Sequence, residues 1–190
     1  MRQLTLFLFS ISLVIAANVR SAEKDVNNDA EWVKEAERIA RQFTHALKPR
    51  LVAAIQAGGF EHAITVCAET APAIAERLSA DSGWTVKRVS LKPRNSAQAS
   101  PDDFEREVLK AFERRSADGE APASLDYTAV VGGRLRYMKA QSVGPLCLNC
   151  HGHSISRDVS ERIKQYYPDD MATGYSQGQI RGAVSLSKPL

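Results

Sequence analysis

The sequence predicts one α+β domain in which helices come first and a mostly antiparallel sheet follows. A chain of 190 residues has room for one ordinary domain with a short appendage. Its composition, 44% hydrophobic and 25% charged, is typical of a soluble globular protein. Apolar residues recur at helical spacing before residue 80, whereas alternating segments and turn signals fill the C-terminal third.

The first 22 residues have the pattern of a secretory signal peptide. Arg2 supplies a positive end, an apolar stretch runs from Leu4 to Ala17, and small residues follow it. This stretch is shorter than the roughly 20 residues of a membrane span, so membrane attachment is expected only if the leader stays uncleaved. We therefore predict a periplasmic protein with a signal peptide at 1–22, a flexible lead-in at 23–30 and one domain at 31–190.

The charge balance argues against a nucleic-acid partner. Removing residues 1–22 removes two arginines and no acid, so the net charge falls from +3 to +1. The mature chain shows no basic stripe with interleaved aromatic residues. We therefore expect no nucleic-acid binding.

Two helices are expected before the sheet. Apolar residues recur at three- and four-residue steps over residues 31–56. A kink or break is expected at Pro49, with a further helical piece at 51–55, and the glycine pair at 58–59 ends that piece. A second helix is predicted over residues 60–79, with an apolar stripe that includes Cys67. Cys67 is therefore expected in the middle of a buried face.

The remaining elements follow from turn and capping signals. Ser100 is the expected N-cap of a helix over residues 101–115, because a proline and an acidic first turn follow it. Gly132–Gly133 lies between two alternating segments and predicts a β-hairpin. We also expect a strand at 84–92, a short helix at 160–166 and a last strand at 180–187.

The segment CLNCHG at 147–152 has three possible interpretations. A structural zinc site needs a second ligand pair, and the chain has none at zinc-binding spacing. A redox dithiol is expected at the start of a helix, but glycine and proline precede this one and Gly152 follows it. Two cysteines followed at once by histidine form the attachment signature of a c-type haem. We therefore predict one covalent haem c, bound through Cys147 and Cys150, with His151 on the iron.

The second axial ligand is not decided by the pattern alone. Cys67 is the cysteine that haem attachment leaves over, and Met138 and Met171 are equal candidates, because haem proteins use both kinds of sulfur ligand. The remaining histidines are less favoured: two lie beside helical stripes and one is too close to His151, namely His45, His62 and His153.

From residue 31 to its end, the chain resembles a family of small exported c-type haem proteins with a PAS-like fold. The family is catalogued as a domain of unknown function, and its known representative is a cyanobacterial protein found with photosystem preparations. Four stretches carry the resemblance: AITVCAETAPAIA at 63–75, VKRVSLKPRN at 86–95 with SPDDFEREVLKAF at 100–112, CLNCHG at 147–152, and YPDDMATGYSQGQIRGAVS at 167–185.

The resemblance implies Cys/His axial ligation of the iron. On the matching positions, the metal ligands are His151 and Cys67, and Met138 and Met171 become packing residues. Two departures concern loops: this chain has Ser96 and Gln98 where the family usually carries a proline and another asparagine, and it lacks a proline near Ala140.

Two functions are compatible with this ligand set. Related domains act as extracytoplasmic sensor modules, so the resemblance favours a redox or gas sensor with a separate signalling partner. The alternative is low-potential electron transfer to a redox partner, because a thiolate ligand favours ferric iron. No set of acid–base groups marks an enzyme, and we expect none. Four basic residues in the matched stretches are candidates for holding the haem propionates: Arg88, Lys92, Arg94 and Arg181.

Overall fold

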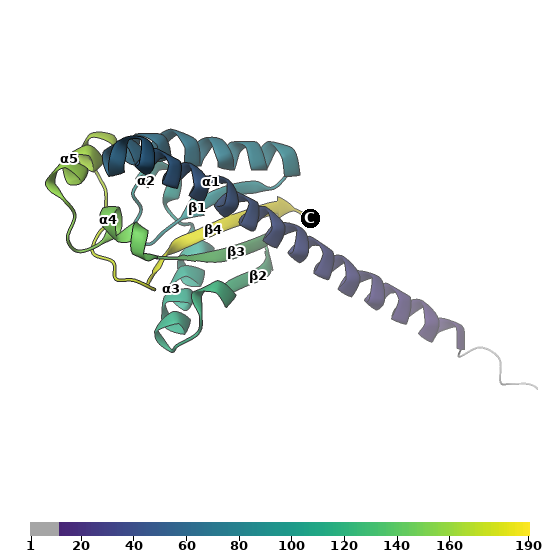
Figure 1. Ribbon diagram of the computed structural model, residues 1–190. Coiled ribbons are helices and arrows are strands. Elements are labelled where there is room, and N and C mark those ends of the chain that lie inside the picture. The colour runs from purple at the N-terminus through teal and green to yellow at the C-terminus, as the bar shows by residue number, and fades with distance from the viewer. Residues whose placement is uncertain (1–11) are drawn as a thin grey trace, which may run out of the picture. The chain divides into compact units, whose positions relative to one another are not determined.

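The computed structural model describes the backbone of residues 12–190 and the side chains of residues 31–190 (Figure 1). The chain divides into two compact units, Met1–Glu35 and Ala36–Leu190, and the second holds the sheet and the site. The predicted signal peptide, residues 1–22, and the predicted lead-in, residues 23–30, lie outside the residues whose side chains are described. Both stay predictions.

Helix α1, Ser12–Ser82, consists of two helical segments. Gly58 and Gly59 have non-helical dihedral angles, which confirms the predicted break at the glycine pair. The chain reverses there, so that the segment after the break runs back above the sheet (Figure 1). Pro49 lies inside the first helical segment, whose residues there keep helical dihedral angles, so the chain does not break at this proline. By length and composition alone, one helix of the described residues, Glu31–Ser82, is apolar enough to cross a membrane, a test that core helices of soluble proteins also pass.

Four antiparallel strands form one sheet in the order β1-β4-β3-β2. The predicted hairpin is confirmed: its two glycines both have positive φ, as a tight turn between paired strands requires. The last strand lies at the centre of the sheet, between the first strand and the hairpin. The strands are β1 Thr85–Val89, β2 Asp126–Val131, β3 Arg134–Ser142 and β4 Ile180–Pro189.

One face of the sheet is covered by helix α3, Asp103–Ala117. The helix buries Leu109 and Phe112 against the sheet, and Met138 of β3 is fully buried in the same cluster. The predicted N-cap at Ser100 was wrong. Asp102 is the N-cap, because its carboxylate accepts from the Glu105 amide while the Glu105 side chain accepts from the Asp102 amide, which forms a capping box.

Glu105, on the same face of the sheet, is a buried carboxylate that is ion-paired with Lys87 and Arg136. Its side chain is fully buried. It accepts from Lys87 Nζ at 2.9 Å and from Ser185 Oγ at 2.6 Å, and Arg136 Nη2 lies 3.3 Å away. A buried carboxylate is tolerated when cations and hydroxyl donors satisfy it in this way. The α3 face is therefore filled and electrostatically matched.

Short helices connect these elements. Helix α5 begins before the predicted residue 160, because Ser156 caps it. The segment between β1 and α3 contains one helical turn, and CLNCHG lies in a 3-10 turn that continues into a four-residue helix. The short elements are α2 Ser96–Ala99, η1 Pro122–Ser124, η2 Pro145–Cys147, α4 Leu148–His151 and α5 Arg157–Tyr166.

Candidate cofactor site

A cavity of about 680 Å³ adjoins the other face of the sheet, on the side of helix α1. Its size is in the range of small-molecule and cofactor pockets. Three thiols and one imidazole, side chains of the kind that bind haem iron or its vinyl groups, are among the described residues that line it: Cys67, Cys147, Cys150 and His151. All three cysteines are free. Among the described residues, no group of three or more His, Cys, Asp or Glu side chains is placed to hold a bare metal ion.

The CLNCHG segment turns tightly enough to bring its donors to one wall. The Cys147 amide donates to the Gly144 carbonyl at 3.0 Å, and His151 is the last residue of α4. Gly152 follows, where a Cβ atom would lie 2.5 Å from the Leu148 carbonyl oxygen. Only glycine fits this close approach, which accounts for the residue that ends the motif.

The ring of His151 is oriented by the loop that follows α5. Its Nδ1 lies 2.7 Å from the Ala172 carbonyl oxygen and 3.3 Å from Arg181 Nε. A carbonyl and a guanidinium cannot both be satisfied by one ring nitrogen, and the shorter contact favours a proton on Nδ1 that is donated to Ala172. This tautomer leaves the Nε2 lone pair available, as in histidines that bind metals.

The surroundings of His151 oppose its protonation. Burial, and then the charges of Arg181 and Arg94, hold the pKa of this imidazole well below its usual range. Backbone bonds fix the residue as well, because its carbonyl accepts from the Tyr175 amide at 2.9 Å. His151 is therefore a neutral, immobilised imidazole at the cavity wall.

Cys67 reaches the cavity from the second segment of α1. Ile64 and Ile74, on the same stripe, are buried as predicted, but Cys67 is only half-buried because it faces the cavity instead of packed side chains. Burial raises the pKa of its thiol, and the positive charges of Arg88 and Arg94 act against this rise.

The rival ligands do not line this cavity. Met138 is fully buried in the core beneath α3, on the other face of the sheet. Met171 is 55% exposed. The three remaining histidines are exposed, namely His45, His62 and His153. Of the candidates that the sequence left open, the structure brings Cys67 alone, among the described residues, to the cavity of His151.

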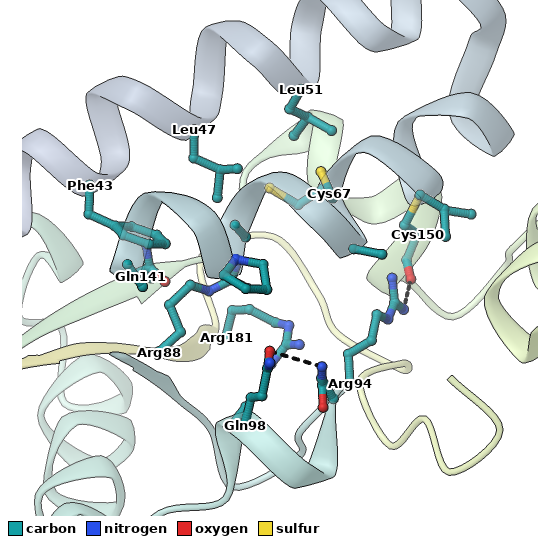
Figure 2. A pocket seen from close by; sticks show the side chains of 18 of the residues that line it. Phe43, Leu47, Leu51, Cys67, Arg88, Arg94, Gln98, Gln141, Cys150 and Arg181 are labelled. Carbon is teal, nitrogen blue, oxygen red and sulfur yellow. Dashed lines mark hydrogen bonds between the residues drawn. The ribbon is translucent and has the colours of Figure 1, made fainter. Parts of the chain in front are cut away.

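The first segment of α1 contributes an apolar wall. Phe43, Leu47 and Leu51 follow one another at four-residue steps and extend from one face of the helix (Figure 2). In this view, the labelled arginines lie on the other side of the segment that carries Cys67. The cavity therefore has apolar side chains and cationic groups in different parts of its lining.

Arg94 lines the cavity and joins three parts of the chain. Its Nε lies 3.1 Å from Asp170 Oδ1 and its Nη2 lies 3.2 Å from Asp170 Oδ2, with both side chains largely buried. The same Nη2 donates to the Cys150 carbonyl (Figure 2). Arg94 thus ties the loop after β1 and the loop after α5 to CLNCHG.

The other predicted basic residues lie in different places. Arg181 lines the cavity, and its Nη1 donates to Ser90 Oγ at 2.8 Å and to the Lys92 carbonyl at 3.1 Å. The Lys92 ammonium group donates to the Thr173 carbonyl at 2.7 Å and does not line the cavity. Arg88 lines the cavity from β1.

Sequence reasoning missed several residues that support the site. Asp170, which pairs with Arg94, and the Ala172 carbonyl, which orients His151, both lie in the matched stretch at 167–185. The family resemblance over residues 167–185 is the sequence signal that could have pointed to these two residues. Tyr167 lines the cavity, whereas Tyr175 packs edge-on against the His151 ring, with centroids 6.4 Å apart.

Fold and site define a class of protein: a small α+β protein whose helical face encloses a cavity lined by thiols and an imidazole. The chain belongs to the Tll0287-like family, whose model matches residues 19–189. It is similar to the crystal structure of the cyanobacterial heme-protein Tll0287, with a TM-score of 0.66 and 22% sequence identity over 84% of this chain and 95% of that chain. The predicted α+β class is confirmed. A search of curated proteins finds no match.

Proposed function

We propose that this chain is a periplasmic monohaem c-type protein that acts as a redox or gas sensor. The observation that carries the proposal is one cavity lined by all three cysteines and by His151. No three His, Cys, Asp or Glu side chains of the described residues are grouped to hold a bare ion, so these donors suit a large prosthetic group better. The heme-protein Tll0287 shares the fold and supports the same group here.

The lining fits haem in its chemistry as well as in its size. Cys147 and Cys150 are free thiols, and each would add across one vinyl group, with sulfur going to one carbon and the proton to the other. His151 would bind the iron through Nε2 while Nδ1 donates to Ala172. Cys67 would be the second axial ligand. When bound, the haem supplies a redox-active iron whose ferric state a thiolate ligand favours.

Sensing is preferred over electron transfer because the two proposed ligands are held differently. His151 lies within the attachment segment and is fixed by Ala172 and Tyr175. Cys67 lies on a separate helical segment behind the glycine break. If Cys67 were lost as a ligand, the covalent attachment through Cys147 and Cys150 would stay intact, and a site for a diatomic ligand would become available. We expect a signalling protein as partner and no catalysed reaction.

The test is the absorption spectrum of the purified full chain in its ferric and ferrous states, with and without carbon monoxide. We expect c-type bands that survive denaturation, a changed ferric spectrum in Cys67→Ala, and carbon monoxide binding to the ferrous parent. Met171→Ala, which removes an exposed sulfur outside the cavity, is the control and should match the parent. A ferrous parent that never binds carbon monoxide would leave electron transfer as the better reading, and absent c-type bands would end the haem proposal.

A further inference from the structure

Among the described residues, three arginines line the cavity, and only two of them have hydrogen-bond or ion-pair partners there. Arg94 is matched by the carboxylate of Asp170. Arg181 donates to the Ser90 hydroxyl and to the Lys92 carbonyl. For Arg88, the described residues provide neither a hydrogen bond nor an ion pair. One cation therefore faces the cavity with its charge and its donors unmatched.

The position of Arg88 is set by the sheet. It lies in β1 opposite Val184 of the central strand β4, and Val86, two residues earlier on the same face, also lines the cavity. Its side chain is half-buried. Because regular pairing on β4 fixes the backbone, the guanidinium group is presented to the cavity from a rigid base.

Leaving such a cation without a partner is unfavourable. Burial lowers the pKa of Arg88, and the ionisable neighbours that act on it include no carboxylate: they are Cys67, Tyr167, Arg94 and Cys147. A partly buried cation without an anion or acceptors costs free energy. The missing partner is therefore expected on the molecule that fills the cavity.

We propose that Arg88 binds a carboxylate of the cavity's ligand, which under the proposed function is a haem propionate. The planar guanidinium group matches a carboxylate with two parallel hydrogen bonds. The inference rests on the proposed function and divides the work of the cavity arginines. Arg88 holds the anionic edge of the ligand, Arg181 stays with the Ser90 hydroxyl and the Lys92 carbonyl, and Arg94 positions Cys150.

The experiment separates the carboxylates from the rest of the ligand. In the full chain carrying Cys147→Ser and Cys150→Ser, uptake of haem is non-covalent, and its affinity is measured for ferric haem and for haem dimethyl ester. We expect Arg88→Gln to weaken haem binding about ten- to a hundredfold, the usual effect of losing a charged hydrogen-bond partner, and to leave ester binding unchanged. Arg88→Lys should lie in between, because a lysine keeps the charge and loses the paired donors.

The control is Arg106→Gln, the same charge change at an exposed position on α3, which should alter neither affinity. Urea unfolding of each haem-free variant verifies that it folds.

Equal losses of affinity for haem and for its dimethyl ester would mean that Arg88 contacts the ring or Cys67 instead. Unchanged affinities would mean that Arg88 contacts nothing on the ligand. Either result overturns the inference. If the chain with the double serine change takes up neither compound, the covalently loaded parent and its Arg88→Gln variant are compared by reduction potential. There, loss of the cation should lower the potential, and equal potentials would overturn the inference. Absence of covalent haem from the parent is a separate result, and it refutes the proposed function itself.

Discussion

The two faces of the sheet are completed in different ways. On the α3 face, apolar side chains fill the space, and the buried carboxylate of Glu105 is matched by Lys87, Arg136 and Ser185. On the α1 face, a cavity of about 680 Å³ remains, with free thiols on its wall and with the cation of Arg88, for which the described residues supply no partner. Alternate residues of the same strands serve both faces.

The difference between the two faces separates residues that stabilise the folded chain from residues that are available to contact a ligand. Filled space and paired charges stabilise the folded chain without any ligand. A cavity and a guanidinium group without a partner reduce the stability of the folded chain. A ligand that fills the cavity and pairs with this group would restore the lost stabilisation. The α3 face is therefore the structural support, and the α1 face is where we propose that a ligand binds.

The largest expected effect compares one substitution on each face. Phe112→Ala on the α3 face should lower the free energy of unfolding by about 4 kcal/mol, because Phe112 is fully buried in packed core. It should leave the absorption spectrum of the loaded protein unchanged. Phe43→Ala, equally buried but lining the cavity, should change that spectrum or the haem affinity. Urea unfolding and absorption spectroscopy measure the two effects.

Phe112→Ala and Phe43→Ala serve as controls for each other, since both variants replace a buried phenylalanine by alanine. A spectrum that changes equally in both variants would show that the two faces are coupled. The proposed division between support and binding would then be wrong.

A smaller effect is expected where the two roles meet. Asp170→Asn removes the charge that matches Arg94, and both side chains are largely buried. We expect a loss of about 3 kcal/mol in unfolding free energy, because the guanidinium group is left without its counter-ion. The spectrum should also shift, since Arg94 holds the Cys150 carbonyl.

The matched control is Asp169→Asn, which makes the same change at the neighbouring, exposed carboxylate. It should affect neither quantity. Asp170→Asn could instead lower stability and leave the spectrum of the haem-loaded protein unchanged. The contact of Arg94 with the Cys150 carbonyl would then have no role in haem binding.

The smallest effect is a pH dependence on the α3 face. Burial alone would raise the pKa of Asp102, but the Glu105 amide and Arg136 outweigh it and lower the pKa. The resulting stabilisation is present above the unfolded-state pKa and is lost as the pH falls through the folded-state pKa, that is, below about pH 4. Asp102→Asn, which can still cap α3, should flatten this acid arm by less than about 1 kcal/mol.

Urea unfolding between pH 2 and pH 7 measures this effect, with Asp103→Asn, at an exposed carboxylate beside it, as the reference. An acid arm that is identical in the parent and in Asp102→Asn would contradict the assigned pKa shift. A changed haem spectrum in Asp102→Asn would contradict the separation of the two faces.

The local patterns of the sequence predicted most of the elements and part of the site. The glycine pairs at 58–59 and 132–133 marked a helix break and a hairpin that the structure contains. The capping residue of α3 was misplaced from Asp102 to Ser100, because two candidate caps stand two residues apart and only Asp102 forms the reciprocal bonds with Glu105. The supporting role of Asp170 depends on a contact 76 residues away in sequence, and no local pattern contains it.

The sequence by itself determined the CLNCHG motif, because Cys147, Cys150 and His151 lie within one turn of chain and their spacing alone brings them together. Tertiary structure decided which distant residues share the cavity. It placed Cys67 there and left Met138 and Met171 outside. It also matched Arg94 with Asp170, while none of the described residues pairs with Arg88. The physical reason is that sheet register and helix packing, which join segments about 80 residues apart, determine what faces an enclosed space.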